Sequence, residues 1–282
     1  MYTLKVKNDR GESMDLTGNP KYTVYQIDGL SPPQAAINSA ANTTMDGSTI
    51  NSTRVESRNI VIYLTINGSI EENRINLYKY FPVKKAVTLY YTNGTRDVHI
   101  EGVVELIECD LFTDRQIAQI SLICANPYFK AVNELITNFN GVDALFEFPF
   151  SITAEGQEFS RIATNVRKSI INTGDVETGA IITLEATGAV VKPTIYNVLT
   201  REQLAINFTM QAGDKIVINT NPGQKSIKLI REGQTSNILG YMTIDSTWLL
   251  LTAGDNIFTY SADGGETALI VAFFTTLLYS GV

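Results

Sequence analysis

The stretch that decides the fold is "VTLYYTNGTRDVHIEGVVELIECDLFTDRQIAQISLIC", residues 87–124, which contains three runs of β-forming residues. Asn93-Gly94 separates the first two runs, and this dipeptide is a strong short-range signal for a β-hairpin. A second short turn near Thr113-Asp114 separates the second run from the third. The pattern predicts three consecutive antiparallel strands, and we therefore expect a mainly β fold around them.

Both cysteines of the chain, Cys109 and Cys124, lie in this stretch. If positions that sum to about 227 face each other in the second hairpin, Cys109 lies opposite Ala118 and Cys124 lies near Val103. At about 3.3 Å per residue the two sulfur atoms are about 20 Å apart, too far for a disulfide. A catalytic thiol also needs a base, and the only histidine, His99, is on the other strand and offset from Cys124. We therefore predict two structural thiols.

The third strand runs into "SLICANPYF", residues 121–129. Asn126 precedes a proline, which biases it toward extended or turn conformations, and Pro127 cannot donate to a β-ladder. We predict a structural corner here, at which the chain leaves the sheet and two aromatic rings fold back over the sandwich. The two rings, Tyr128 and Phe129, are expected to cover apolar surface near Leu122 and the strand that carries Val104 and Leu106.

One helix is expected in the first half, near residues 70–81, among strands at 2–8, 21–30 and 57–68. Ser69 and Glu72 have capping-box spacing, apolar residues recur at helical intervals, and Pro82 ends the pattern. Arg74 is either an ion-pair anchor or a solvated helix residue. The predicted inner face consists of Ile70, Arg74, Leu77 and Phe81, widened by Ile75 and Tyr78.

A long excursion interrupts the first half between residues 31 and 57. Two prolines open it, and from Asn38 to Ser57 it is rich in Asn, Ser and Thr. So polar a segment cannot form its own core, and long excursions from compact domains are often functional. We predict a long loop or an extended hairpin that projects from its domain and makes contacts with other subunits or with a partner protein.

The second half has a different pattern. Beyond Asn172, short alternating or apolar runs are punctuated by Gly, Asn, Asp and Pro at intervals of about 8–14 residues, which predicts an antiparallel β-sandwich or jelly roll. The transition near Asn140 predicts two domains, 1–140 and 141–282. The runs are residues 180–188, 190–197, 204–210, 214–221, 226–233, 246–256, 257–265 and 268–279.

Composition narrows the classes of function. The 282-residue chain has 22 basic and 29 acidic residues, a net charge of −7, which argues against specific nucleic-acid binding because such binding needs a basic surface. The first residues lack the apolar core of a signal peptide. The longest apolar run, 268–279, is shorter than the roughly 20 residues that span a bilayer. We expect no membrane insertion, and we expect either synthesis and use in a reducing cytoplasm or export by another route such as cell lysis.

Catalytic motifs are missing from the sequence. It contains no HExxH, GxSxG, Walker or GxGxxG pattern, and a single histidine excludes most zinc sites and argues against a Ser-His-Asp triad. A glycosidase needs only two carboxylates, so that alternative stays open. Residues 262–266, "ADGGE", predict a tight turn rather than a calcium loop, and Trp248 is expected in or beside a core. We predict no catalytic, cofactor-binding or metal-ligating residues and no cofactor.

Several segments in order resemble one family, the distal tail proteins of long-tailed, siphophage-type bacteriophages. "GLSPP" follows an early strand, "SRNIVIYLTI" precedes the helix "ENRINLYKYFP", and "GVVELIECDLF" leads to "QISLICANPYF". At the end of "QISLICANPYF" the family usually has Cys-Pro-Asp-Pro-Tyr-Phe. Here Ala125 and Asn126 replace the Pro-Asp of that motif. In the second half "IINTGDVETGAIITLEATGAVVKPTIYN", "GDKIVINTNPGQKSIKL", "STWLLLTAGDN" and "YSGV" are similar to its C-terminal domain.

The resemblance implies an N-terminal β-sandwich with one helix and a galectin-like, jelly-roll C-terminal β-sandwich. It implies a structural protein of the virion tail, not an enzyme. Six copies are expected to form a hexameric ring that joins the tail tube to the tail-tip or baseplate hub protein and lets DNA pass. Phages, prophages and tail-like bacteriocins use such parts, which are assembled in the host cytoplasm.

Two alternatives belong to other classes of protein. A carbohydrate-binding module in residues 140–282 would aid adhesion to the host cell wall if Trp248 were an exposed stacking platform. No histidine lies in that half, and no polar cluster is apparent around Trp248. A cell-wall hydrolase is the remaining alternative.

Overall fold

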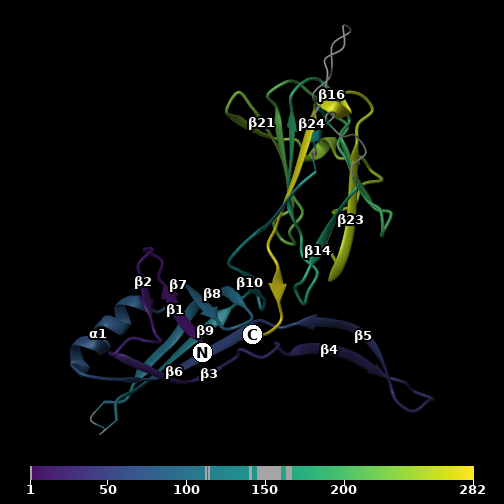
Figure 1. Ribbon diagram of the computed structural model, residues 1–282. Coiled ribbons are helices and arrows are strands. Elements are labelled where there is room, and N and C mark those ends of the chain that lie inside the picture. The colour runs from purple at the N-terminus through teal and green to yellow at the C-terminus, as the bar shows by residue number, and fades with distance from the viewer. Residues whose placement is uncertain (1, 112, 114, 140–141, 145–159, 163–166) are drawn as a thin grey trace. The chain divides into compact units, whose positions relative to one another are not determined.

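The computed structural model describes residues 2–111, 113, 115–139, 142–144, 160–162 and 167–282. The chain forms two compact units, one of Met1–Asn133 with Leu278–Val282 and one of Glu134–Leu277 (Figure 1). The sequence predicted a division near Asn140 and did not anticipate that Leu278–Val282 returns to the first unit. Strands dominate both units, which confirms the predicted mainly β fold.

The first unit is built on one nine-stranded antiparallel sheet. Its strands are β1 (Thr3–Lys7), β2 (Ser13–Asp15), β3 (Tyr22–Asp28), β6 (Arg58–Ile66), β7 (Ala86–Thr92), β8 (Asp97–Cys109), β9 (Ile117–Cys124), β10 (Phe129–Ala131) and β25 (Leu278–Tyr279). The main path is β2-β1-β7-β8-β9-β6-β3, with β10 paired to β8 and β25 paired to β10. The three predicted strands of residues 87–124 are its centre.

Both predicted hairpins form. β7 and β8 are joined by four residues, and the Asn93 side chain closes this loop by accepting from the amide of Arg96 at 2.8 Å. In the second hairpin Cys109 pairs with Ala118, as predicted. A bulge between Val104 and Leu106 then shifts the register by one residue. The prediction that Cys124 lies near Val103 is therefore wrong by one position, because Val103 pairs with Ile123.

Helix α1 (Ile70–Tyr80) confirms the predicted helix, but its cap and inner face differ from the prediction. Ser69 makes no side-chain capping bond, so the predicted capping box does not form. Ile75 is 61% exposed rather than part of the inner face. Within the helix only Asn73 and Leu77 are buried. The Asn73 side chain donates to the carbonyl of Asn67 at 2.7 Å and ties the first turn to the preceding loop.

The predicted corner after β9 forms, with one difference. Phe129 is fully buried and starts β10, where it joins the same core as Leu122 and Val104. Leu106 is 41% exposed on the opposite face of the sheet, because the bulge that precedes it reverses the alternation of β8. Of the two residues that marked the strand beneath the rings, Val104 therefore faces the core and Leu106 does not. Tyr128 is only half-buried.

The excursion at residues 31–57 is an extended hairpin. Strands β4 (Ala35–Ala41) and β5 (Ser48–Val55) pair with each other and form a separate two-stranded sheet (Figure 1). Both strands are exposed along almost their whole length, which fits the prediction that this segment has no core of its own.

The second unit is an antiparallel sandwich with one core between two sheets. The six-stranded sheet contributes Ile182 and Ile216, and the four-stranded sheet contributes Phe258 and Tyr260. The first sheet has the order β11 (Leu135–Asn138), β24 (Leu269–Thr275), β15 (Ile181–Ala186), β20 (Lys215–Asn219), β21 (Ser226–Arg231) and β22 (Gln234–Asn237). The second has the order β14 (Lys168–Asn172), β23 (Gly254–Ser261), β17 (Thr194–Asn197) and β18 (Gln203–Ala205).

Smaller elements complete this unit. They are the pairs β12 (Val142–Ala144) with β13 (Ser160–Ile162) and β16 (Val190–Val191) with β19 (Thr209–Met210), and the 3₁₀ turns η1 (Leu239–Tyr241) and η2 (Glu266–Ala268). No helix in the described part of the chain is long and apolar enough to cross a bilayer.

Two predicted strands of the second half differ in the structure. Most of the run 246–256 is not a strand, and Leu251 makes only an isolated bridge to Thr178. Its leucines still pack inward, as Leu249 and Leu251 are buried. The apolar run 268–279 splits into β24, in the core of the second unit, and β25, in the first unit.

Candidate interaction surfaces

The two thiols are free and have no catalytic partner nearby. Cys124 is fully buried, and burial raises its pKa to about 11, so that it stays protonated at neutral pH. Burial also raises the pKa of Cys109. The prediction that they form no disulfide is confirmed. Cys124 faces Gly102, where an added Cβ would lie 2.9 Å from the sulfur atom.

His99 lies on the opposite face of the sheet from this thiol. His99 and Gly102 are three residues apart on β8, so their side chains point to opposite faces. The His99 ring lies beside Tyr90, with 5.6 Å between ring centroids. Burial, and then the positive charge of Lys130, lower the histidine pKa. The structure therefore does not bring together a cysteine and a histidine that could act as nucleophile and base.

The other candidates for chemistry have structural contacts. Arg74 pairs with Glu71 in the preceding turn and bonds the Tyr78 hydroxyl at 3.2 Å, which favours the ion-pair interpretation. Trp248 is half-buried against the core, as predicted, and Lys225 Nζ lies 5.6 Å from its ring centre. In the predicted turn at 262–266, Gly264 bridges Val191. No group of three or more His, Cys, Asp or Glu side chains that could hold a metal occurs among the described residues.

The first interaction surface is one face of the β4–β5 hairpin, which we call the hairpin face. It carries three exposed apolar side chains, Ile37 and Ile50 at 61% each and Val55 at 40%. In antiparallel pairs, directly opposed residues point to the same side. Ile37 pairs with Thr53, and Val55 pairs with Ala35 two residues before Ile37, so Ile37 and Val55 share a side.

A bulge places Ile50 on the same face. The register shifts between Asn38 and Ser39, which leaves Asn51 as the extra residue of β5 and pairs Ile50 with Ser39. Ser39 is two residues from Ile37 and lies on the same side. Without the bulge, Ile50 would point to the opposite side, with Arg54. The bulge therefore gathers three apolar residues on one face of an otherwise polar hairpin.

The second surface is the face of the nine-stranded sheet that points away from the core, which we call the outer sheet face. Alternation places Leu4 and Val6 of β1 inside and the lysines between and beside them outside. Near its middle the outer sheet face carries exposed apolar residues, Val103 at 45% and Leu106 at 41%. Exposed acidic residues of β8 flank them, namely Glu101, Glu105 and Glu108.

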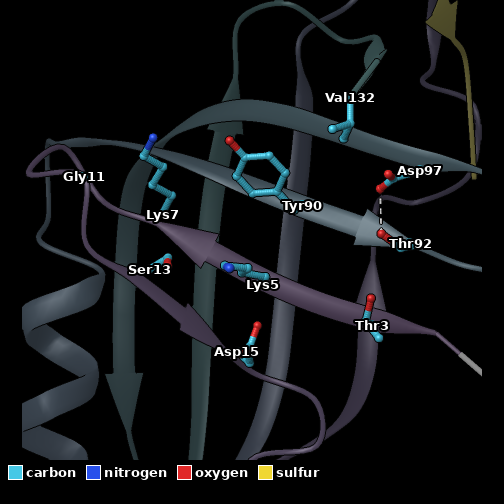
Figure 2. A pocket seen from close by; sticks show the side chains of 10 residues that line it. All are labelled: Thr3, Lys5, Lys7, Gly11, Ser13, Asp15, Tyr90, Thr92, Asp97 and Val132. Atoms are coloured by element: carbon cyan, nitrogen blue, oxygen red, sulfur yellow. Dashed lines mark hydrogen bonds between the residues drawn. The ribbon is translucent and has the colours of Figure 1, made fainter.

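A groove of about 540 Å³ lies on the outer sheet face over β2, β1 and β7 (Figure 2). Its floor follows one rung of the sheet, in which Asp15 pairs with Lys5 and Lys5 pairs with Tyr90. At one end the Thr92 hydroxyl donates to Asp97 at 2.7 Å. The groove combines ammonium, carboxylate and phenol groups without a nucleophile and base in contact, which suits a polar protein contact better than catalysis.

The fold of the whole chain is shared with solved phage proteins. The SPP1 Dit protein, described as a paradigm of the hub adsorption apparatus in phages that infect Gram-positive bacteria, matches with a TM-score of 0.70 over 99% of both chains at 12% identity. A chain of the phage P2 baseplate, in its activated conformation with Ca, matches with a TM-score of 0.53 over 100% of both chains at 14% identity. The same baseplate with Sr matches with a TM-score of 0.52 over 98% of this chain and 97% of that chain at 15% identity. Identities this low show a common fold.

The sequence itself matches one family. Residues 173–275 match the siphovirus-type tail component, C-terminal domain, whereas the comparison with curated protein sequences finds no match. The second unit therefore matches the siphovirus-type tail component family over residues 173–275, and the whole chain shares the β-sandwich fold of the SPP1 Dit protein. The predicted resemblance to the distal tail proteins is confirmed, since the match lies in the second unit and the shared fold covers the chain.

The sequence missed the surfaces themselves. It predicted that the excursion projects from its domain. In a regular hairpin, however, Ile37 and Ile50 would point to opposite faces, and no local signal marks the bulge that brings them to the same face. The apolar part of the outer sheet face was missed for the same reason, because the bulge after Val104 places Leu106 on that face.

Proposed function

We propose that six copies of this chain form a ring at the distal end of a siphophage tail. The ring joins the tail tube protein to the tail-tip or baseplate hub protein, and DNA passes through its centre. The observation that carries this proposal is that the first unit has two unpartnered surfaces of different shape, the hairpin face and the outer sheet face. Contacts between unlike surfaces are head-to-tail, and they generate rings when the rotation closes.

In this contact the β4–β5 hairpin extends to the neighbouring subunit. A hairpin whose two isoleucines are each 61% exposed is marginal by itself in water, and burying them against a neighbouring subunit removes apolar area from water. The apolar part of the outer sheet face around Val103 and Leu106 offers a matching surface on the next copy. Tube and hub proteins then bind the remaining faces of the ring.

The charge balance fits the passage of DNA. A net charge of −7 gives the ring no general attraction for phosphates, so DNA can slide through it without being held. Location in the virion tail, after assembly in the host cytoplasm, follows from the same proposal.

Light scattering and electron microscopy of the purified chain test the ring. The expected species is a hexamer or a ring-dependent multiple of it. A strict monomer at tens of micromolar, together with no ring on tail particles, contradicts the proposal.

Paired variants test the role of the hairpin face. Ile37→Asp with Ile50→Asp places two charges on this face, and assembly should fail while the monomer stays folded. Asn38→Asp with Ser52→Asp places the same charges on the opposite face of the same hairpin, and assembly should persist. Deletion of residues 38–52 should likewise leave a folded monomer that does not assemble. Unfolding of the deletion variant, or equal assembly of both paired variants, counts against this role.

The carbohydrate-binding alternative is not favoured. Trp248 packs against the core of the second unit with Lys225 over its ring, so it does not present a free aromatic platform.

A further inference from the structure

The segment Leu278–Val282 follows the second unit but belongs to the first, and we infer that it is a clasp that fixes the root of the β4–β5 hairpin. The hairpin leaves the nine-stranded sheet through residues 29–34, and it shares no sheet with any other strand of the described chain. Its direction is therefore set at this root. We call Leu278–Val282 the clasp.

The clasp is held in place by main-chain pairing. Phe129 pairs with Tyr279 and Lys130 pairs with Leu278, which adds β25 to the sheet beyond β10. The Arg96 guanidinium lies 4.4 Å from the centre of the Tyr279 ring and donates to the carbonyl of Gly281. The loop between β7 and β8 and the corner after β9 thus position the clasp.

The end of the clasp contacts the hairpin root directly. The amide of Val282 donates to the carbonyl of Leu30 at 3.1 Å. Gly281 is buried, and a Cβ added there would lie 3.0 Å from Pro32 Cδ and 3.2 Å from the carbonyl oxygen of Leu30. A side chain at position 281 would therefore require Pro32 and the Leu30 carbonyl to shift by a few tenths of an ångström.

Arg58 joins the clasp and the root through a buried guanidinium that is 3% exposed. Its Nη1 donates to the carbonyls of Gly29 and Ser31, and its Nη2 donates to the carbonyl of Ser280. Nε donates to the carbonyl of Pro127 at 2.7 Å. A buried cation needs all of its donors satisfied, and here the acceptors come from the root, the corner and the clasp.

The root of the hairpin is held in one conformation only while the clasp is in place. If the clasp leaves, Arg58 loses the Ser280 carbonyl, Leu30 loses the Val282 amide, and Pro32 loses the surface against which it packs. The pairs of β4 with β5 remain, because they do not involve the clasp, whereas the Glu56–Gln34 bond that joins this ladder to the root opens more often. The hairpin then stays formed but loses its fixed direction, so the clasp positions the hairpin rather than folding it.

Native-state hydrogen exchange tests the clasp in Gly281→Ala, Arg58→Lys and a chain that ends at Tyr279. The reporter is the amide of Glu56, which donates to the carbonyl of Gln34 at the root. Its exchange should become faster by about tenfold or more in all three variants. Exchange at Ile62 and Ile120, in the centre of the sheet, should not change. Gly94→Ala is the matched control, because a Cβ added there meets nothing within 4 Å.

Two results overturn the inference. One is unchanged exchange at Glu56 in all three variants. The other is an equal rise at Ile62 and Ile120, which makes the clasp an ordinary part of the core. Ring formation is measured on the same samples and rests on the proposed function. Faster exchange at Glu56 with normal rings supports the clasp and contradicts the proposed need for a fixed hairpin in assembly.

Discussion

Substituting Phe129→Ala should destabilise the first unit more than any other single truncation at the corner after β9. The ring is fully buried in the core, and the guanidinium of Arg58 lies 4.6 Å from its centre. Alanine therefore removes core volume and also the surface on which a buried cation rests.

The magnitude follows from these two contacts. Truncation of a buried phenylalanine costs about 3–5 kcal/mol, and a buried cation–π contact contributes about 2 kcal/mol, part of which is already counted in that range. We therefore expect a loss of about 4–5 kcal/mol in the free energy of unfolding. Domains are stable by about 5–15 kcal/mol, so a third or more of the stability of this unit is at risk.

Urea denaturation can follow the two units separately. The chain has one tryptophan, Trp248, which lies in the second unit, so its fluorescence reports that unit alone. Circular dichroism reports both units. In Phe129→Ala an early transition should appear by circular dichroism, while the tryptophan midpoint should stay unchanged. Tyr128→Ala is the control, because this neighbouring aromatic is only half-buried and should cost clearly less. A Phe129→Ala protein as stable as the unmodified chain refutes the corner as a structural element.

Three further predictions concern buried groups. Cys124→Ser should cost about 1–3 kcal/mol, since it buries a hydroxyl without an assigned partner. Because burial raises the pKa of this thiol from 9.0 to about 11, stability should fall as the pH rises through this window, and Cys124→Ser should show a smaller fall in urea titrations. Gly102→Ala should cost about 1–3 kcal/mol in the free energy of unfolding, because the added Cβ would lie 2.9 Å from the Cys124 sulfur. A double variant with Cys124→Ala should recover part of this loss. Strictly additive losses in this double-mutant cycle would contradict the contact. Arg231 holds the pKa of Asp214 below its ordinary value of 3.8, so the second unit should lose stability as the pH falls below about 3.8. Followed by Trp248 fluorescence, this loss should be smaller in Asp214→Asn. An equal loss of stability at low pH in both proteins would contradict the prediction.

Much of the strand content was predictable because its signals are local. The alternation of apolar and polar residues marked β7, β8 and β9, and Asn93-Gly94 marked the turn between the first two. The helix before Pro82 was predictable for the same reason. Some details differed from the local rule, as at Ser69, which makes no capping bond, while the Asn73 side chain ties the first turn to the preceding loop.

The interaction surfaces depended on register, which is not local. A bulge adds one residue to a strand and reverses the parity of every side chain beyond it, and this moved Leu106 to the outer sheet face and Ile50 to the hairpin face. Alternation alone cannot place the bulge, because its position depends on how the strand pairs with its partner strand.

The sequence by itself determined most of the strands, where the main hairpins turn and that both cysteines remain thiols, because each of these depends on neighbours along the chain. Only the tertiary structure decided where Arg58 places its donors and where residues 278–282 pair. The acceptors of Arg58 lie at positions 29, 31, 127 and 280, and no local pattern links positions so far apart. The order of strands in the sheet brings them to one point, and a buried guanidinium requires all of them.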